Sequence, residues 1–147
     1  MSYQHILIPV DGSSTSKIAI QHAASLAKAF NSRITAICVL TVDPFVGVEF
    51  VNSAEFSKDY MNKVKEEIQD ILTETKTLFA REGINIETQI IEGQSIYKEI
   101  VNTATDIKAD LIVIGSHGRK GFKKFVLGSV TQALLGEAHV PVLVVRE

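Results

Sequence analysis

Five short apolar runs, separated by segments with helical periodicity, constrain the fold of this chain more than any other feature. Residues 5–10, 34–40, 110–114 and 140–145 are apolar almost throughout, with little alternation between apolar and polar positions. Such runs are typical of strands that are buried on both faces of a parallel sheet. Residues 84–90 instead alternate apolar and polar side chains, which predicts a strand with one wet face near an edge of the sheet.

Apolar residues at helical spacing predict helices between these runs, at residues 15–31, 95–108 and 129–138. A further helix is expected to start with a capping box at Asn52–Glu55 and to end at Gly83. The regular alternation of strand and helix predicts an α/β fold. Its core would be a single doubly wound, five-stranded parallel sheet with helices on both faces and right-handed crossovers.

Length and composition restrict the class of protein. A chain of 147 residues with 46% hydrophobic and 22% charged residues is ordinary for one globular domain, so we expect residues 1–147 to form a single domain. The net charge of −2 gives no basic field that would indicate nucleic acid as the main partner. There is neither a signal-peptide pattern nor an apolar run near 18 residues, which favours a cytoplasmic protein without a membrane partner. Cys38, the only cysteine, cannot form an internal disulfide and is expected to be a small buried hydrophobe.

A glycine-rich stretch follows the fourth apolar run. Glycines occupy positions 115, 118, 121 and 128, and Ser129 begins the last predicted helix. Glycine lets the backbone turn sharply and lets N–H groups approach a ligand closely. The start of a helix adds free N–H groups and the positive end of the helix dipole.

The charges around this stretch are of one sign. No acidic residue lies between Leu111 and Gly136, and the four bases there are Arg119, Lys120, Lys123 and Lys124. The stretch therefore predicts an anion cradle suited to phosphate. The alternative is an ordinary loop whose glycines follow a strand and whose basic side chains are solvated.

The same edge of the sheet carries a second candidate ligand group. Asp11-Gly12 follows the first strand, as Gly115 to Gly118 follows the fourth. Ligands of open α/β sheets bind beyond the carboxyl ends of the strands, where the winding direction switches. If both segments serve one site, the first and fourth strands must be neighbours. The order 3-2-1-4-5 achieves this and leaves the alternating third strand at an edge.

The spacing Gly115-x2-Gly118-x9-Gly128-Ser129 resembles the ATP-binding signature of the nucleotide-binding branch of the universal stress protein family. Residues 8–13 resemble the opening motif of that family, residues 110–118 its signature strand and loop, and residues 141–145 its closing strand. The resemblance thus covers the whole chain. It implies a Rossmann-like fold of the adenine nucleotide alpha hydrolase type, with residues 1–147 as one universal stress protein domain.

The resemblance also implies roles for individual residues. Asp11 would contact the ribose of ATP, although a helix cap is the alternative role. Pro9 and Val10 would line the adenine and ribose pocket, and the backbone of Val39 would contact adenine, although a core valine would look the same. The glycine loop and the start of the last helix would hold the phosphates. The candidate cofactor-binding residues are Pro9, Val10, Asp11, Val39, Gly115, Ser116, His117, Gly118, Arg119, Gly128, Ser129, Val130 and Thr131.

No catalytic residue is predicted. No Ser-His-acid or Cys-His arrangement surrounds His117 in the sequence, and a loop histidine is more often incidental. Arg119 and Lys120 would either screen phosphate charge or be solvated. No cluster of metal ligands is visible, so Mg²⁺, if present, would accompany the triphosphate and keep mostly water ligands.

These features favour a homodimeric module that binds ATP or a related adenine nucleotide and acts as a stress-response sensor or regulator, with a regulatory protein partner left open. The alternative is a slow ATPase or a phosphotransfer enzyme, but a Walker A loop is absent and no acidic pair is placed to hold Mg²⁺ or to activate water. An adenylate-forming enzyme would need Ser-Gly-Gly-x-Asp after the first strand, where this chain has Asp11-Gly12-Ser13-Ser14. A phospho-receiver would need further acids beside Asp11 and a lysine after the fifth strand.

Residues 140–145 carry the prediction of a homodimer. In the order 3-2-1-4-5 this strand lies at an edge, and all its residues are apolar, with only Pro141 as an interruption. An uncovered edge of this kind would aggregate, so we expect it to pair with its copy about a two-fold axis. The alternative is that the N-terminal segment or a helix covers it. The long connection at residues 41–51 is interpreted either as a plain loop or as a lid over the strand ends.

Overall fold

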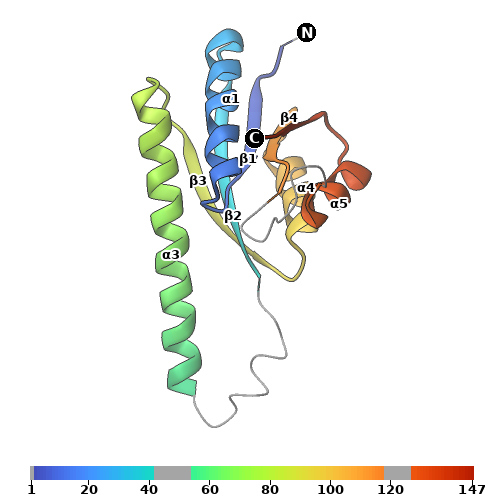
Figure 1. Ribbon diagram of the computed structural model, residues 1–147. Helices are drawn as coiled ribbons and strands as arrows, with labels where there is room; N and C mark the ends of the chain where they lie inside the picture. Colours follow the sequence, from blue (N-terminus) through green and yellow to red (C-terminus); the bar gives the residue numbers. More distant parts are fainter. Residues whose placement is uncertain (1, 42–53, 118–126) are drawn as a thin grey trace.

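The computed structural model describes residues 2–41, 54–117 and 127–147, which form an α/β structure around one parallel sheet (Figure 1). The sheet has five strands in the order β3-β2-β1-β4-β5, which confirms the predicted fold class and strand order. The strands are β1 (His5–Pro9), β2 (Arg33–Thr41), β3 (Glu87–Gly93), β4 (Leu111–Gly115) and β5 (Val142–Val145). The helices are α1 (Ser14–Phe30), α3 (Ala54–Arg81), α4 (Ile96–Asp106) and α5 (Ser129–Glu137).

Helices cover both faces of the sheet: α1 and α3 lie on one face, and α4 and α5 lie on the other (Figure 1). Ile6 and Ile8 of β1 belong to the hydrophobic cluster on the α1 and α3 side, whereas Leu7 belongs to the cluster on the α4 and α5 side. All three side chains are fully buried. Because successive residues of a strand point to opposite faces, burial of both faces removes the apolar–polar alternation, as the sequence indicated.

The observed β3 begins later than the alternating segment 84–90 predicted. The N–H of Ile84 donates to the carbonyl of Phe79 (3.0 Å), so Ile84 still belongs to the turn that closes α3. Gly83 has φ +78° in this turn, which confirms its predicted role after the helix. Ile86 packs into the core before the ladder with β2 starts at Glu87. The alternation of apolar and polar residues at 84–90 therefore indicates which side chains are buried, and it does not indicate where pairing with β2 begins.

The observed β5 also begins later than predicted. Its ladder starts at Val142 because Pro141 has no N–H, although the Pro141 carbonyl accepts from the N–H of Ile112 (3.0 Å). β5 is an edge strand, as expected. The predicted cap at Asn52 and all of the segment 41–51 except Thr41 lie outside the described residues. Within the described ranges, no helix is long and apolar enough to cross a membrane.

The position of the site follows from the connections of β1 and β4. These strands are parallel neighbours, with Ile6 opposite Leu111. The chain leaves β1 for α1 on one face of the sheet and leaves β4 for α5 on the other face. The winding direction therefore switches between β1 and β4, and this is where α/β sheets bind ligands.

Candidate functional site

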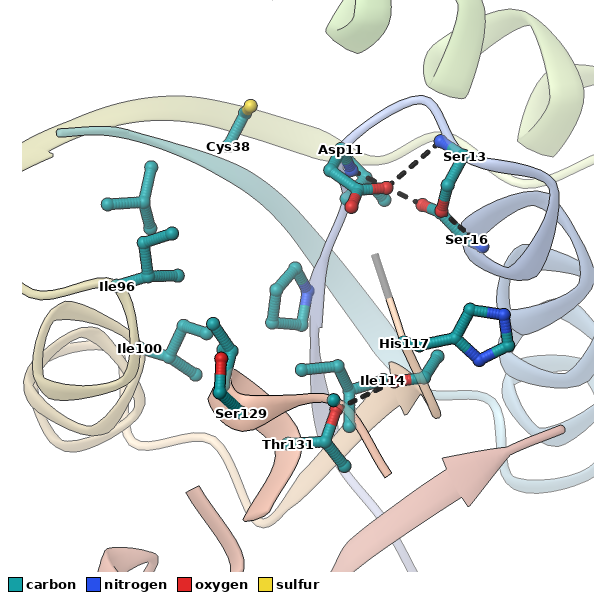
Figure 2. Close-up of a pocket in the computed structure, with 16 residues that line it drawn as sticks. Asp11, Ser13, Ser16, Cys38, Ile96, Ile100, Ile114, His117, Ser129 and Thr131 are labelled. Carbon is teal, nitrogen blue, oxygen red and sulfur yellow. Dashed lines mark hydrogen bonds between the residues drawn. The ribbon is translucent and has the colours of Figure 1, made fainter. Parts of the chain in front are cut away.

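A cavity of about 460 Å³ opens over the carboxyl ends of the central strands (Figure 2). Its walls come from the ends of β1, β2 and β4 and from the first turns of α1, α4 and α5. The volume lies within the range of about 300–1,000 Å³ that is usual for small-molecule sites. Segments that are far apart in the sequence thus converge at the predicted switch point.

Most of the residues predicted from the sequence line this cavity. They are Pro9, Val10, Asp11, Val39, Gly115, His117, Gly128, Ser129, Val130 and Thr131. Gly118 and Arg119 lie outside the described residues, as do the other basic residues of the glycine-rich stretch, Lys120, Lys123 and Lys124.

Ser116 was also predicted to contact a ligand, but the structure places it behind the wall of the cavity. Its side chain is buried, and its Oγ lies 3.0 Å from Nδ1 of His117. Its N–H donates to the carbonyl of Val145 (2.8 Å), and its carbonyl accepts from the N–H of Gly128 (2.7 Å). Ser116 therefore connects β5 to the start of α5 and holds the neighbouring residues of the wall in place.

The first turn of α5 lines the cavity, and no side-chain hydrogen bond caps the start of this helix. Gly128 is the N-cap residue and has no side chain to accept from the backbone N–H groups of this turn, and the first turn contains no acidic residue. Thr131 is buried, and its hydroxyl donates to the carbonyl of Gly115 (2.9 Å), which ties α5 to the end of β4. An uncapped helix start has donors and a positive dipole end available for an anion.

Two of the signature glycines have a packing role that the sequence did not reveal. A Cβ at Gly115 would lie 2.7 Å from Cγ2 of Thr15, and a Cβ at Gly128 would lie 3.1 Å from Cα of His117. At Gly115 the missing side chain makes room for the first turn of α1, and at Gly128 it makes room for the backbone that follows β4. These two glycines therefore bring the walls of the cavity close together.

Asp11 is held in the wall by the turn between β1 and α1. Its Oδ1 accepts from the N–H of Ser13 (2.9 Å), and Gly12 between them has φ +80°. The N-cap of α1 is Ser13, whose Oγ accepts from the N–H of Ser16 (3.2 Å). The alternative role of Asp11 as the helix cap is therefore wrong, and its carboxylate is part of the cavity wall.

His117 lies among hydroxyl groups. Its Nε2 is 3.5 Å from Oγ1 of Thr15, which donates to Oε1 of Glu147 (3.1 Å). The hydroxyl of Ser14 donates to the same carboxylate oxygen (2.5 Å). Ser116, the hydroxyl beside Nδ1, is buried behind the wall and does not line the cavity. His117 thus has hydroxyl neighbours on both ring nitrogens, and the nearest serine is not presented to a ligand.

The described part of the chain contains no group of three or more His, Cys, Asp or Glu side chains that could hold a metal ion. Of the described residues that line the cavity, Asp11 alone carries a carboxylate. The arrangement is suited to binding an anion at the start of α5 and polar hydroxyl groups at Asp11.

Comparison with known proteins identifies the family. The model of the universal stress protein family matches residues 2–146. The chain belongs to the universal stress protein family. Universal stress protein MJ0531 of Methanocaldococcus jannaschii is 41% identical over 145 residues, which cover 99% of this chain and 83% of the relative. Universal stress protein MJ0577 of the same organism is 31% identical over 155 residues, which cover 98% of this chain and 95% of the relative.

Solved structures of the family have the same fold. The structure of MJ0577 superposes with a TM-score of 0.85 and covers 100% of this chain and 98% of its own. A universal stress protein in complex with cAMP has a TM-score of 0.71 at 24% identity, over 99% of this chain and 98% of its own. A universal stress protein from Archaeoglobus fulgidus in complex with dAMP has a TM-score of 0.71 at 21% identity, over 99% of this chain and 100% of its own.

In this member of the family, sequence reasoning missed part of the cavity wall. The residues that line the cavity but were not predicted to do so are Ser13, Ser16, Cys38, Ile96, Ile100 and Ile114. Cys38 was predicted only as a small buried hydrophobe, and the other five were given no role in ligand binding. One signal was available. The strand order 3-2-1-4-5 brings the carboxyl end of β2 and the helix that follows β3 close to the switch point, which indicates Cys38 and Ile96.

Proposed function

We propose that this universal stress protein binds an adenine nucleotide, ATP in particular, in the cavity over β1 and β4. The uncapped first turn of α5 is the observation that carries the proposal, because it presents backbone donors to the cavity at the position of the family's phosphate signature. The complexes of two other universal stress proteins with cAMP and dAMP support an adenine nucleotide as the class of ligand.

The described residues fit the parts of such a ligand. Phosphate oxygens would accept from N–H groups of Ser129, Val130 and Thr131, since the Thr131 hydroxyl already donates to Gly115. The Asp11 carboxylate would accept from ribose hydroxyls. The base would lie against Val39, near the end of β2. Mg²⁺ would arrive with the triphosphate and supply charge neutralisation there, keeping mostly water ligands.

We propose further that the protein acts as a nucleotide-dependent module and not as a rapid enzyme, and that it works as a homodimer paired through β5. Leu143 in the middle of this edge strand is 37% exposed, so apolar surface lies at an edge that carries no charged side chain. A second copy of the same strand would cover it. A regulatory protein partner would then bind differently to the nucleotide-bound dimer and to the nucleotide-free dimer.

The substitution Ser129→Pro tests the phosphate site directly. Proline is tolerated at the first position of a helix and removes the N–H there without breaking a helical hydrogen bond. Gly128 has φ −61° and ψ 156°, a conformation that is favourable before proline. Loss of a hydrogen bond to a charged group costs about 1.5–3 kcal/mol, so ATP affinity should fall about 10- to 150-fold in calorimetry.

Ser129→Ala is the matched control, because it removes the hydroxyl and keeps the N–H. We expect a much smaller loss of ATP affinity for this variant, and the same circular dichroism for both. Equal affinities of the wild type and Ser129→Pro would rule out the start of α5 as the phosphate site.

A further inference from the structure

The cavity has two chemically different ends. Asp11, Ser13 and His117 lie together on one side, where α1 begins and β4 ends (Figure 2). Ile96 and Ile100 of α4 lie on the opposite side (Figure 2). No described lining residue on the α4 side carries a charged or amide side chain. Ser129, at the start of α5, lies next to Ile100 (Figure 2), so a ligand that covers Ile96 must present an apolar surface to this residue, whatever polar groups it presents elsewhere.

Ile96 and Ile100 are four residues apart and so share one face of α4. Ile100 is fully buried in the core cluster on this side of the sheet, whereas Ile96 is 36% exposed. The side chain of Ile100 therefore has no solvent-exposed surface that a ligand could cover. Ile96 has apolar surface that a ligand can still cover, which makes it the residue of this helix that can gain from binding.

We infer that Ile96 is a specificity-determining residue that favours purine over pyrimidine nucleotides; the inference rests on the nucleotide-binding function proposed above. The faces of a nucleobase are flat and apolar. The residues of α4 that line the cavity have no charged or amide side chain that could hydrogen-bond to the edge of the base. Selection at this wall is therefore by contact area. A two-ring purine extends further along the wall than a one-ring pyrimidine does and covers more of Ile96.

The test compares ATP, CTP and adenosine binding to the wild type and to Ile96→Ala by titration calorimetry. Truncation removes the apolar surface that the base covers, so affinity for ATP should fall about fivefold. Adenosine should lose affinity by the same factor, because the lost contact is with the base and not with the phosphates. CTP should lose less than about twofold, so the preference for ATP over CTP shrinks.

Leu135→Ala is the matched control. Leu135 is a similarly exposed apolar side chain, at 45%, but it lies on α5 and does not line the cavity. Its truncation should leave all three affinities unchanged. Ile96→Thr is a second variant that keeps the branched Cβ, and it should lie between the wild type and Ile96→Ala in its preference for ATP.

The outcomes separate the two proposals. A wild-type protein that binds neither ATP nor adenosine would overturn the nucleotide function and this inference with it. Nucleotide binding by the wild type, together with an unchanged ratio of ATP to CTP affinity in Ile96→Ala, would overturn this inference alone. A fall in ATP affinity without a fall in adenosine affinity would also overturn it, because the effect would then come from the phosphate side.

Discussion

Replacement of Gly115 by alanine should destabilise the protein through a steric conflict with α1. The added Cβ would lie 2.7 Å from Cγ2 of Thr15, 3.2 Å from its Cβ and 3.3 Å from its carbonyl carbon. Thr15 is buried, so its methyl group cannot swing into solvent, and the backbone carbon cannot move without shifting the helix. Overpacking of this kind costs about 1–3 kcal/mol, which corresponds to a fall of about 4–8 °C in the unfolding midpoint for the middle of that range.

The variant Thr15→Ser identifies the contact responsible. It removes the Cγ2 methyl group but keeps the hydroxyl that donates to Glu147, and alone it should cost about 1 kcal/mol. Combined with Gly115→Ala it relieves the shortest contact. The double variant should therefore be less destabilised than the sum of the single changes, by about 1 kcal/mol. The remaining contacts to Thr15 keep the rescue incomplete.

Urea and thermal unfolding would be measured at one fixed protein concentration, because a dimer would make the midpoint depend on concentration. Gly136→Ala is the matched control. Gly136 lies in α5 with no atom within 4 Å of the added Cβ, so the change should stabilise the protein by about 0.5–1 kcal/mol. If Gly115→Ala unfolded at the wild-type midpoint, or if its effect simply added to that of Thr15→Ser, the packing role of this glycine would be wrong.

Three further predictions concern the turn after α3, the edge strand and turnover. Gly83→Ala should lower the free energy of unfolding in urea by about 1 kcal/mol, because Gly83 has φ +78°. No atom lies within 4 Å of the added Cβ, so the strain comes from the backbone conformation alone. An unchanged urea midpoint would contradict this account. Leu143→Lys should make the protein sediment as a monomer at micromolar concentration, where the proposed pairing through β5 predicts a dimer for the wild type. It is preferable to substitutions at Val142 and Val144, which pack against the core, and a wild type that already sediments as a monomer would disprove the interface. ATP turnover by pure protein should stay far below about 10 per second, the median for enzymes, and a rate of that size abolished by Ser129→Pro would show that the site is catalytic.

Much of the fold could be predicted because the conformational preferences of single residues and the pattern of apolar residues indicated the same strands and helices. The run at Ile6, Leu7 and Ile8 predicted a strand buried on both faces, and the structure buries all three residues completely. Gly83 was predicted after α3 because its backbone must adopt a positive φ, which is a local property. The start of β3 was predicted less well, because an alternation of apolar residues reports burial, while the strand begins only where β2 offers a partner.

The candidate site also has some features that the sequence predicts and others that only the structure shows. The spacing of Gly115, Gly128 and Ser129 is a property of the chain. It predicted the family, which is confirmed, and an anion site at the start of α5, which stays a prediction. Whether a given neighbour faces the cavity was not predictable, as Ser116 shows. It lies between two lining residues but is turned inward by backbone hydrogen bonds to Val145 and Gly128.

Only the tertiary structure decided which side chains form the walls of the cavity. Helical periodicity places Ile96 and Ile100 on one face, but it does not distinguish the fully buried residue from the one that is 36% exposed at the cavity. The reason that Gly115 must lack a side chain lies at Thr15, and the ring of His117 meets the same threonine across 102 positions of sequence. Contacts of this kind depend on how the ends of separate strands and helices meet in space, and neither periodicity nor spacing along the chain carries that information.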